Sequence, residues 1–208
     1  MKDNWERLYH CCCLLKITGY HSMVQLNFDP PVLKTGRLVL RKISVEDAED
    51  IFILRTNEEA MKYINKPKLN TIEDAIELID KMNEPVRINW GITLKNDSKI
   101  IGTIGYHRIE KDHYRAEIGY MLDPAYWNTG LMSEAIEKVI NFGFNEMNLH
   151  SIEANINPGN MVSRKILQKF NFVKEAYFKE NFFFEGNFLD SEVYSLLKGQ
   201  EPANYNLS

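Results

Sequence analysis

The sequence predicts a single α+β domain, and three observations support that prediction. Short runs of alternating apolar and polar residues, typical of strands, recur between segments with the 3.6-residue apolar period of helices. Residues 117–156 read as strand, helix and strand, a unit that makes its two strands parallel with a right-handed crossover. Of the 208 residues, 44% are hydrophobic and 26% are charged, which excludes a disordered chain, a collagen and a coiled coil.

The first half of the predicted domain contains one strand followed by helices. Two Ser/Thr-to-Asp pairs, Ser44 with Asp47 and Thr71 with Asp74, have the spacing of a capping box and therefore mark helix starts. Pro67 follows the short helical turn and separates it from the next helix. In order, we expect a strand at 37–43, a helix after Ser44, a helical turn near 58–64 and a long helix after Thr71.

The second half carries most of the predicted sheet. The residues Lys-Asn-Asp-Ser at 95–98 have the composition of a turn between two strands. Asn171 suits the left-handed conformation that ends a helix. In order, we expect strands at 89–94, 99–109 and 115–122, a helix at 131–145, a strand at 151–156, a helix at 160–169, and strands at 174–184 and 188–197.

This pattern gives three parts to the chain. Residues 32–200 form the predicted domain, residues 1–31 an N-terminal extension and residues 201–208 a C-terminal tail. The extension lacks a clean period, and we hypothesise that Met23 is the natural start. Its three cysteines are adjacent, at 11–13, a spacing that does not let several sulfurs converge on one ion, so no metal site is expected.

Charge and hydropathy restrict the possible partners. The formal net charge of −4 gives no general attraction to nucleic acid or to an anionic membrane. No window approaches the ~18 consecutive apolar residues of a membrane span. We therefore expect a cytoplasmic protein, monomer or homodimer, with neither nucleic acid nor membrane as a partner.

The segment 120–135 is the first candidate for chemistry, because a strand ends there, a short loop turns and a helix begins. The first N–H groups of a helix lack internal partners, and with the helix dipole they attract anions. Gly130 permits close approach of a phosphate to the backbone, and Ser133 adds a hydroxyl donor. The loop lacks the P-loop and dinucleotide-binding glycine patterns, which argues against a nucleotide triphosphatase or a dehydrogenase.

A second strand-turn-helix junction lies at 155–163. Asn160 is a suitable N-cap, with its side chain accepting from the N–H of residue 162 or 163. Ser163 lies one turn further along the same helix.

With these motifs, the segment 34–198 resembles the GNAT acetyltransferases, and within them the branch of ribosomal-protein N-terminal acetyltransferases. The family-like residues are 35–41, 116–120, 127–135, Asn160-x-x-Ser163, Lys169-x-x-Phe172, and Gly186-x-Phe188-x-Asp190 near Tyr194.

The resemblance implies a twisted mixed sheet of about seven strands, with helices on both faces and a splay between the parallel strands 115–122 and 151–156. Acetyl-CoA would lie in that splay as co-substrate, with its pantetheine arm on the backbone of 120–122 and its pyrophosphate on the amides of 128–133. The implied CoA-binding residues are Tyr120, Met121, Leu122, Trp127, Asn128, Thr129, Gly130, Leu131, Met132, Ser133, Asn155, Asn160 and Ser163.

Four positions depart from the family pattern. The family often has glycine where Asn128 stands and a small residue where Met132 stands, so either residue weakens CoA binding if it intrudes on the loop. Asn171 replaces a glycine, and Leu167 stands where many members carry a tyrosine acid. The tyrosine mechanism therefore does not carry over to this chain.

Acyl transfer needs a base for the amine, a donor for the thioester oxygen and a donor for the leaving thiolate. The candidates are Glu117 as base, acting through water, the N–H of Leu122 or a neighbour for the oxygen, and Ser163 for the thiolate. A weak base suffices for an α-amine, whose pKa is ~7.7–8.0 against ~10.4 for lysine.

The expected activity is therefore transfer of an acetyl group from acetyl-CoA to a primary amine, and an N-terminal amine of a protein or peptide is favoured. A small-amine acetyltransferase acting on polyamines or amino sugars, and a non-catalytic acyl-CoA-binding module, are the alternatives. Trp90, Tyr106 and His107 are the candidate acceptor-pocket residues, although aromatic residues at strand spacing more often belong to a core.

Overall fold

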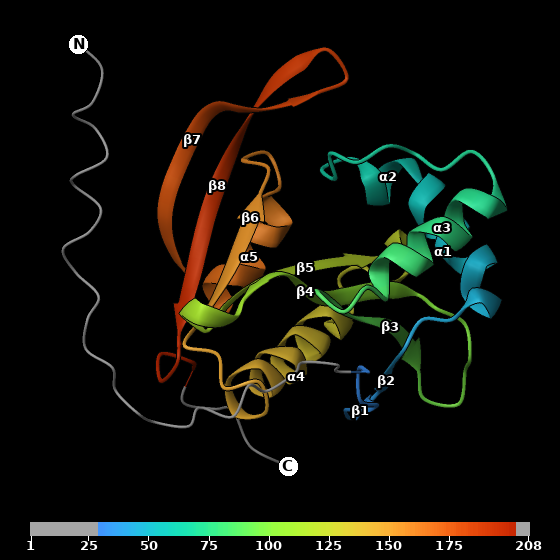
Figure 1. Ribbon diagram of the computed structural model, residues 1–208, viewed down its shortest axis with the longest axis horizontal. Coiled ribbons are helices and arrows are strands. Elements are labelled where there is room, and N and C mark those ends of the chain that lie inside the picture. The colour runs from blue at the N-terminus through green and yellow to red at the C-terminus, as the bar shows by residue number, and fades with distance from the viewer. Residues whose placement is uncertain (1–28, 203–208) are drawn as a thin grey trace, which may run out of the picture.

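The structure is a computed structural model that describes residues 29–202. They form one sheet with helices on both of its faces (Figure 1). The expectations for the three adjacent cysteines and for Met23 concern residues outside this range. The division into extension, domain and tail stays a prediction.

The elements follow the expected order closely. The strands are β1 (Leu33–Lys34), β2 (Leu38–Arg41), β3 (Ile88–Leu94), β4 (Gly102–Glu110), β5 (Arg115–Leu122), β6 (Ser151–Ile156), β7 (Val173–Phe184) and β8 (Asn187–Leu197). The helices are α1 (Ala48–Thr56), α2 (Glu58–Met61), α3 (Ile72–Met82), α4 (Leu131–Asn145) and α5 (Met161–Lys169).

The helix starts obey the expected capping rules. Thr71 accepts from the N–H of Asp74, whose carboxylate accepts in return from the N–H of Thr71. The Ser44 N–H donates to the Asp47 carboxylate at 2.8 Å. That pair opens a short 3₁₀ turn before α1, so the helix itself begins at Ala48 rather than directly after Ser44.

The sheet has the order β1-β2-β3-β4-β5-β6-β8-β7. It has eight strands instead of about seven, because the two-residue strand β1 adds to the edge through the pairs Leu33↔Leu40 and Lys34↔Val39. The second strand of the central hairpin starts later than expected. Ile100 donates its N–H to the Asp50 side chain instead of to the neighbouring strand, so β4 begins at Gly102.

The strands β5 and β6 are the parallel pair that the β-α-β pattern predicts. They are paired only at Arg115↔Ser151, Ala116↔Ile152 and Glu117↔Glu153. Beyond Glu117, β5 stays on β4 as far as Leu122, whereas β6 stays on β8 as far as Ile156. The sheet therefore opens between these two strands, and the opening begins next to Glu117.

Different helices cover the two faces of the sheet. The helix α4 packs Ile136, Val139 and Ile140 against one face, in a core cluster that also takes in Leu167 of α5. The helices α1 and α3 form a second cluster on the opposite face, and Figure 1 shows them across β3–β5 from α4. Because side chains alternate along a strand, each residue of β4 and β5 faces one of these two sets of helices.

Candidate active site

A cleft of about 870 Å³ runs into the opening between β5 and β6. Side chains from both faces of the sheet line it. Glu117 and His107 lie on the α1/α3 side, together with residues of α1 and of the segment between α2 and α3. Tyr120, Asn155 and Ser163 line it from the α5 side. The cleft thus connects the two faces where the sheet ladder is interrupted.

The loop that precedes α4 has a special backbone. Asn128 has φ 60° and Gly130 has φ +80°, both in the left-handed region. Asparagine tolerates that region better than other non-glycine residues, which explains how Asn128 stands where the family often has glycine. Gly130 is the N-cap of α4, and no side chain caps this helix. The N–H groups of its first turn are therefore left open to a ligand.

The side chains of Leu131 and Met132 point away from that helix end. They are only 5% and 7% exposed and belong to the main core cluster. Of these two residues, only the backbone amides are available at the loop, and the Met132 side chain does not crowd it.

Three neighbours hold the loop in place. Trp127 donates its indole N–H to the carbonyl oxygen of Leu122 at 2.8 Å. Thr129 donates its hydroxyl to the Tyr126 carbonyl, and its own carbonyl accepts from Arg37 at 2.9 Å. These bonds fix the loop before any ligand arrives.

The start of α5 lies across the opening from the end of β5. Asn160 caps α5 as expected, accepting from the N–H of Ser163 at 3.0 Å. The Tyr120 hydroxyl is buried and has no hydrogen-bond partner within the described part of the chain. Burial raises the pKa of Tyr120 to about 12, against a smaller opposing effect of the nearby Ser163 hydroxyl. Tyr120 therefore keeps its proton at neutral pH.

Glu117 is held at the apex of the opening. Burial raises its pKa, although the guanidinium of Arg108 lies 2.9 Å from its carboxylate and opposes the shift. Arg108 lies at a bulge of β4, where φ is 45°, and its side chain is mostly exposed. A carboxylate with a raised pKa is a better proton acceptor than an ordinary one.

His107 is the strand partner of Glu117, and its ring lies over Gly119, where a Cβ would come within 2.8 Å of it. Burial lowers the pKa of His107 to about 4, and the charges of Arg87 and Lys66 add to the shift. The imidazole is therefore neutral near pH 7, and its buried Nδ1 has no partner among residues 29–202.

The two other residues expected in the acceptor pocket do not line this cleft. Trp90 and Tyr106 are completely buried on the α4 face, and neither borders the cleft, so that expectation is wrong. Trp90 packs edge-on against Phe142, with ring centroids 5.3 Å apart. The Tyr106 hydroxyl donates to the Val139 carbonyl at 2.9 Å.

Basic side chains on the acceptor side were not anticipated from the sequence. Arg55 at the end of α1, Lys66 after α2, and Arg87 before β3 all line the cleft. No sequence motif marks them, because they come from separate segments that only the fold brings together.

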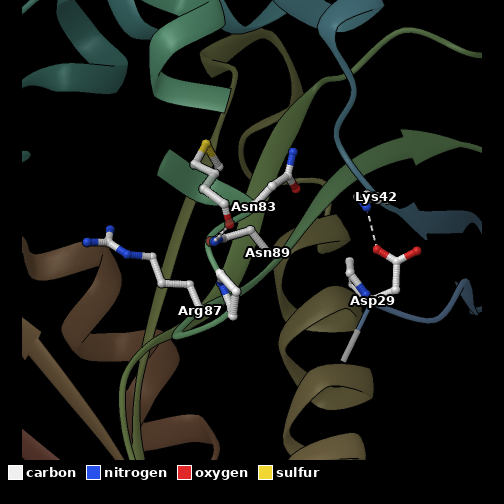
Figure 2. A pocket seen from close by; sticks show the side chains of 8 residues that line it. Asp29, Lys42, Asn83, Arg87 and Asn89 are labelled. Carbon is white, nitrogen blue, oxygen red and sulfur yellow. Dashed lines mark hydrogen bonds and ion pairs between the residues drawn. The ribbon is translucent and has the colours of Figure 1, made fainter. Parts of the chain in front are cut away.

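A second, smaller hollow of about 260 Å³ shares Met82, Arg87 and Asn89 with the first cleft. Figure 2 shows the side chains that line it. Asp29 and Lys42 form an ion pair at its edge. Asn89 donates to the Met82 carbonyl at 2.6 Å, and Asn83 to the Ile43 carbonyl at 3.1 Å. These polar groups already have partners, so the hollow gives no argument for a ligand.

Residues 29–202 contain no group of three or more His, Cys, Asp or Glu side chains placed to hold a metal ion. No helix in this range is long and apolar enough to cross a membrane.

The family model described as "Acetyltransferase (GNAT) domain" matches residues 37–173. The uncharacterized N-acetyltransferase YoaA of Bacillus subtilis is 38% identical over 175 residues, which cover 82% of this chain and 99% of that protein.

Among solved structures, a GNAT-family acetyltransferase from Bacillus anthracis superimposes with a TM-score of 0.73 at 30% identity, covering 80% of this chain and 98% of that one. The ribosomal-protein-S5-alanine acetyltransferase of Vibrio fischeri superimposes with a TM-score of 0.69 at 26% identity, covering 83% of this chain and 100% of that one. The spermidine N-acetyltransferase of Vibrio cholerae, solved with CoA and spermine, superimposes with a TM-score of 0.71 at 22% identity, covering 78% of this chain and 96% of that one. The expected fold, and the resemblance to the ribosomal-protein branch, are confirmed.

Proposed function

The chain belongs to the GNAT acetyltransferase family and is an acetyl-CoA-dependent N-acyltransferase, and on that premise we propose that its acceptor is the N-terminal α-amine of a peptide or protein. The observation that carries the proposal is the cleft, which begins where β5 and β6 part and joins the two faces of the sheet beside Glu117. One co-substrate can enter from each face, and the two meet at this opening.

On the α4/α5 side, we propose that acetyl-CoA lies in the opening. The pantetheine arm runs along the backbone of Tyr120, Met121 and Leu122, whose β6 side has no strand partner. The pyrophosphate binds the first amides of α4 and the loop 127–130, supported by the helix dipole. Asn155 and Asn160 contact the arm from β6 and α5. The CoA bound by the Vibrio cholerae neighbour supports this choice of ligand class.

On the α1/α3 side, Glu117 acts as the base for the attacking amine, directly or through a water that the neutral His107 helps to hold. The amine nitrogen attacks the thioester carbonyl carbon, the C–S bond breaks, and the proton lost by the amine passes to Glu117. An α-amine with a pKa of ~7.7–8.0 loses its proton readily. The Glu117 carboxylate, whose pKa is raised, is therefore a sufficient base.

The leaving thiolate needs a proton or a donor on the other side of the opening. Ser163 at the start of α5 is the proposed donor. The protonated hydroxyl of Tyr120 lies near Ser163 and supports it in this role. The sequence departs from the tyrosine-acid pattern at Leu167, which is completely buried. A tyrosine on β5 in place of one on α5 supplies the same kind of O–H group.

The charge of the cleft weighs against a polyamine acceptor. Its lining carries the cations Arg55, Lys66, Lys81, Arg87 and Arg108, but only Glu117 and Asp190 as anions. Lys81, Arg87 and Arg108 have carboxylate partners in Glu77, Glu84 and Glu117. Arg55 and Lys66, which form no ion pair among the described residues, are the cations that would repel a polycation. The ribosomal-protein acetyltransferase of Vibrio fischeri, at 26% identity, supports a protein acceptor.

The test is release of free CoA thiol from acetyl-CoA with three acceptors: a tetrapeptide amide with a free N-terminus, spermidine and an aminoglycoside. We expect turnover with the peptide at least about tenfold faster than with the other two. Faster turnover of spermidine or of the aminoglycoside would contradict the proposed acceptor. Thiol release with none of them, together with binding of acetyl-CoA, would instead favour a binding module.

A further inference from the structure

Arg55 is a charged side chain that has no hydrogen-bond or ion-pair partner among residues 29–202. It lies in the last turn of α1, lines the cleft and is largely buried. Its Nε is completely buried and has no acceptor among residues 29–202. Burial alone lowers the pKa of Arg55, and no carboxylate offsets the shift.

Such a group is costly to keep. Arginine stays protonated in proteins and presents five N–H donors in a fixed fork. Removing this charge from water without a counter-charge or hydrogen bonds is unfavourable. A guanidinium that lines a cleft, with its Nε buried and unpaired among the described residues, is therefore complementary to an anion that enters the cleft.

The other charges of the cleft do not supply that anion. Glu117 is paired with Arg108, and Asp190 accepts from the Tyr177 hydroxyl and from the N–H of Glu180. Lys66 forms no ion pair with any described residue. It lies near enough to the reaction centre to shift the pKa values of both Glu117 and His107.

The position of Arg55 separates its ligand from the phosphates of CoA. Arg55 belongs to α1, across the sheet from the α4 terminus that is proposed for the pyrophosphate. An anion at Arg55 therefore belongs to the acceptor.

We propose that the acceptor peptide carries a carboxylate close to its N-terminal amine, an Asp or Glu side chain that Arg55 binds with Lys66 beside it. This inference rests on the proposed function, because it names the kind of peptide that the same cleft takes. The carboxylate fixes the peptide while the amine lies at Glu117.

Cations of the cleft also favour the chemistry. Arg87 and Lys66 add to the burial that lowers the pKa of His107, and a cationic surrounding disfavours the ammonium form of a bound amine in the same way. The acceptor amine is then more readily neutral and nucleophilic. The carboxylate of the peptide compensates for the repulsion that its ammonium would otherwise meet on entering.

The experiment compares two matched peptides, Ser-Glu-Ala-Ala-amide and Ser-Gln-Ala-Ala-amide, as acceptors for the full chain. We expect the acidic peptide to have a kcat/KM about tenfold or more above that of the neutral one, which corresponds to about 1.4 kcal/mol. In Arg55→Gln the ratio of kcat/KM for the acidic peptide to kcat/KM for the neutral peptide should fall towards one, because the value for the acidic peptide falls. Arg55→Lys, which keeps the charge, should retain part of the preference.

Lys34→Gln is the control, because it removes one positive charge from an exposed position on β1, at the far edge of the sheet. Lys34→Gln should leave the ratio of kcat/KM for the acidic and neutral peptides unchanged. Raising the salt from about 50 to 500 mM should reduce that ratio in the wild type. Melting temperatures of all variants show whether each one is folded.

A readout without turnover keeps the two proposals apart. The N-acetylated forms of both peptides are titrated into the wild type and into Arg55→Gln by calorimetry. Tighter binding of the acidic product, lost in Arg55→Gln, supports the anion site even if turnover is slow. Equal rates and equal binding for the two peptides would overturn the inference while leaving peptide acetylation intact. Acetylation of spermidine in preference to both peptides would instead overturn the proposed function.

Discussion

Arg37 and Glu134, separated by 97 positions, join the start of β2 to the first turn of α4. The Glu134 carboxylate accepts from the backbone N–H and from the Nε of Arg37, both at 2.7 Å, while another nitrogen of the same guanidinium binds the Thr129 carbonyl. Partial burial by itself would raise the pKa of Glu134, but hydrogen bonds from Thr35 and Arg37 hold it below the ordinary value. The pair thus fixes the loop proposed for the CoA pyrophosphate.

The first prediction follows from that pair. Arg37→Ala removes both the ion pair and the bond to Thr129, so the loop should lose its preformed shape. We expect the Kd for acetyl-CoA, measured by calorimetry, to rise about tenfold with a small loss of stability, since the Arg37 side chain is half exposed. Arg115→Ala removes the ion pairs to Glu110 and Glu153 at the other end of β5, far from the loop, and serves as the control. Equal Kd values for the two variants would show that Arg37 does not organise the loop.

The second prediction concerns Gly130. Alanine there is strained at φ +80° and comes within 3.4 Å of the Arg37 guanidinium. Acetyl-CoA at ~100 times Kd should stabilise the wild type by ~2.7 kcal/mol, and this shift in melting temperature should be largely lost in Gly130→Ala. Gly186→Ala is a matched control, because Gly186 has φ +82° with nothing near its Cβ position. It should show the same strain cost and a normal response to acetyl-CoA. A normal response of Gly130→Ala would argue against phosphate binding at this loop.

Most of the fold was predictable because local patterns and tertiary structure agree. The range of α4 matches the expected helix at 131–145, and the range of β6 matches the expected strand at 151–156. The errors lie at the ends of helices and strands, where a single contact decides at which residue the element begins. The Asp50 carboxylate takes the N–H of Ile100 and so delays the start of β4.

The candidate site was predictable only where a motif marks it. The α4 start has such a motif, whereas the acceptor side is assembled from α1, α3 and the strands. Trp90 and Tyr106 were misplaced because alternation does not reveal which face meets which helix. The close approach of Tyr106 to Gly143, where a Cβ would lie 2.3 Å from the hydroxyl, is visible only in three dimensions. The position of Arg55 in the cleft was not predictable for the same reason, because only the tertiary structure places it there.

The third prediction tests Glu117. Glu117→Gln keeps the shape and removes the proton acceptor, so kcat should fall by ~10²–10⁴ with little change in the Kd for acetyl-CoA. The loss should shrink at high pH, where the amine is neutral without help. Because burial raises the pKa of Glu117, the wild-type rate should fall on the acidic side at a higher pH than an ordinary carboxylate would give. Glu110→Gln, at the end of β4, is the control. Near-normal turnover of Glu117→Gln would leave His107, or a water held by backbone groups, as the base.

The fourth prediction concerns Tyr120 and Ser163. The Tyr120 hydroxyl is buried and has no hydrogen-bond partner among residues 29–202, so Tyr120→Phe should leave the melting temperature unchanged or raise it. If the O–H group supports the leaving thiolate, kcat should nevertheless fall, as it should in Ser163→Ala. Tyr106→Phe provides the contrast, because it removes a bond to Val139 and should cost about 1 kcal/mol of stability with kcat preserved. A stable Tyr120→Phe with full kcat would assign the hydroxyl no part in the reaction.

The fifth prediction concerns His107, whose pKa is lowered to about 4 from an ordinary 6.5. Between these two values the unfolded chain binds a proton at this residue and the folded chain does not. The contribution of His107 to stability is therefore complete above about pH 6.5 and is lost as the pH falls towards 4, by up to roughly 3 kcal/mol.

Melting temperatures of the wild type and His107→Gln, measured from pH 7.5 to 4, check this prediction. Acid destabilises both proteins through their carboxylates, so the informative quantity is the difference between the two curves. The wild type should lose more stability than the variant below pH 6.5, whereas His113→Gln, at an exposed position, should follow the wild type. Parallel curves for the wild type and His107→Gln would mean that the imidazole accepts its proton without unfolding the cleft. His107 would then be charged beside Glu117 at mildly acidic pH, and it would no longer serve as a neutral group that holds water there.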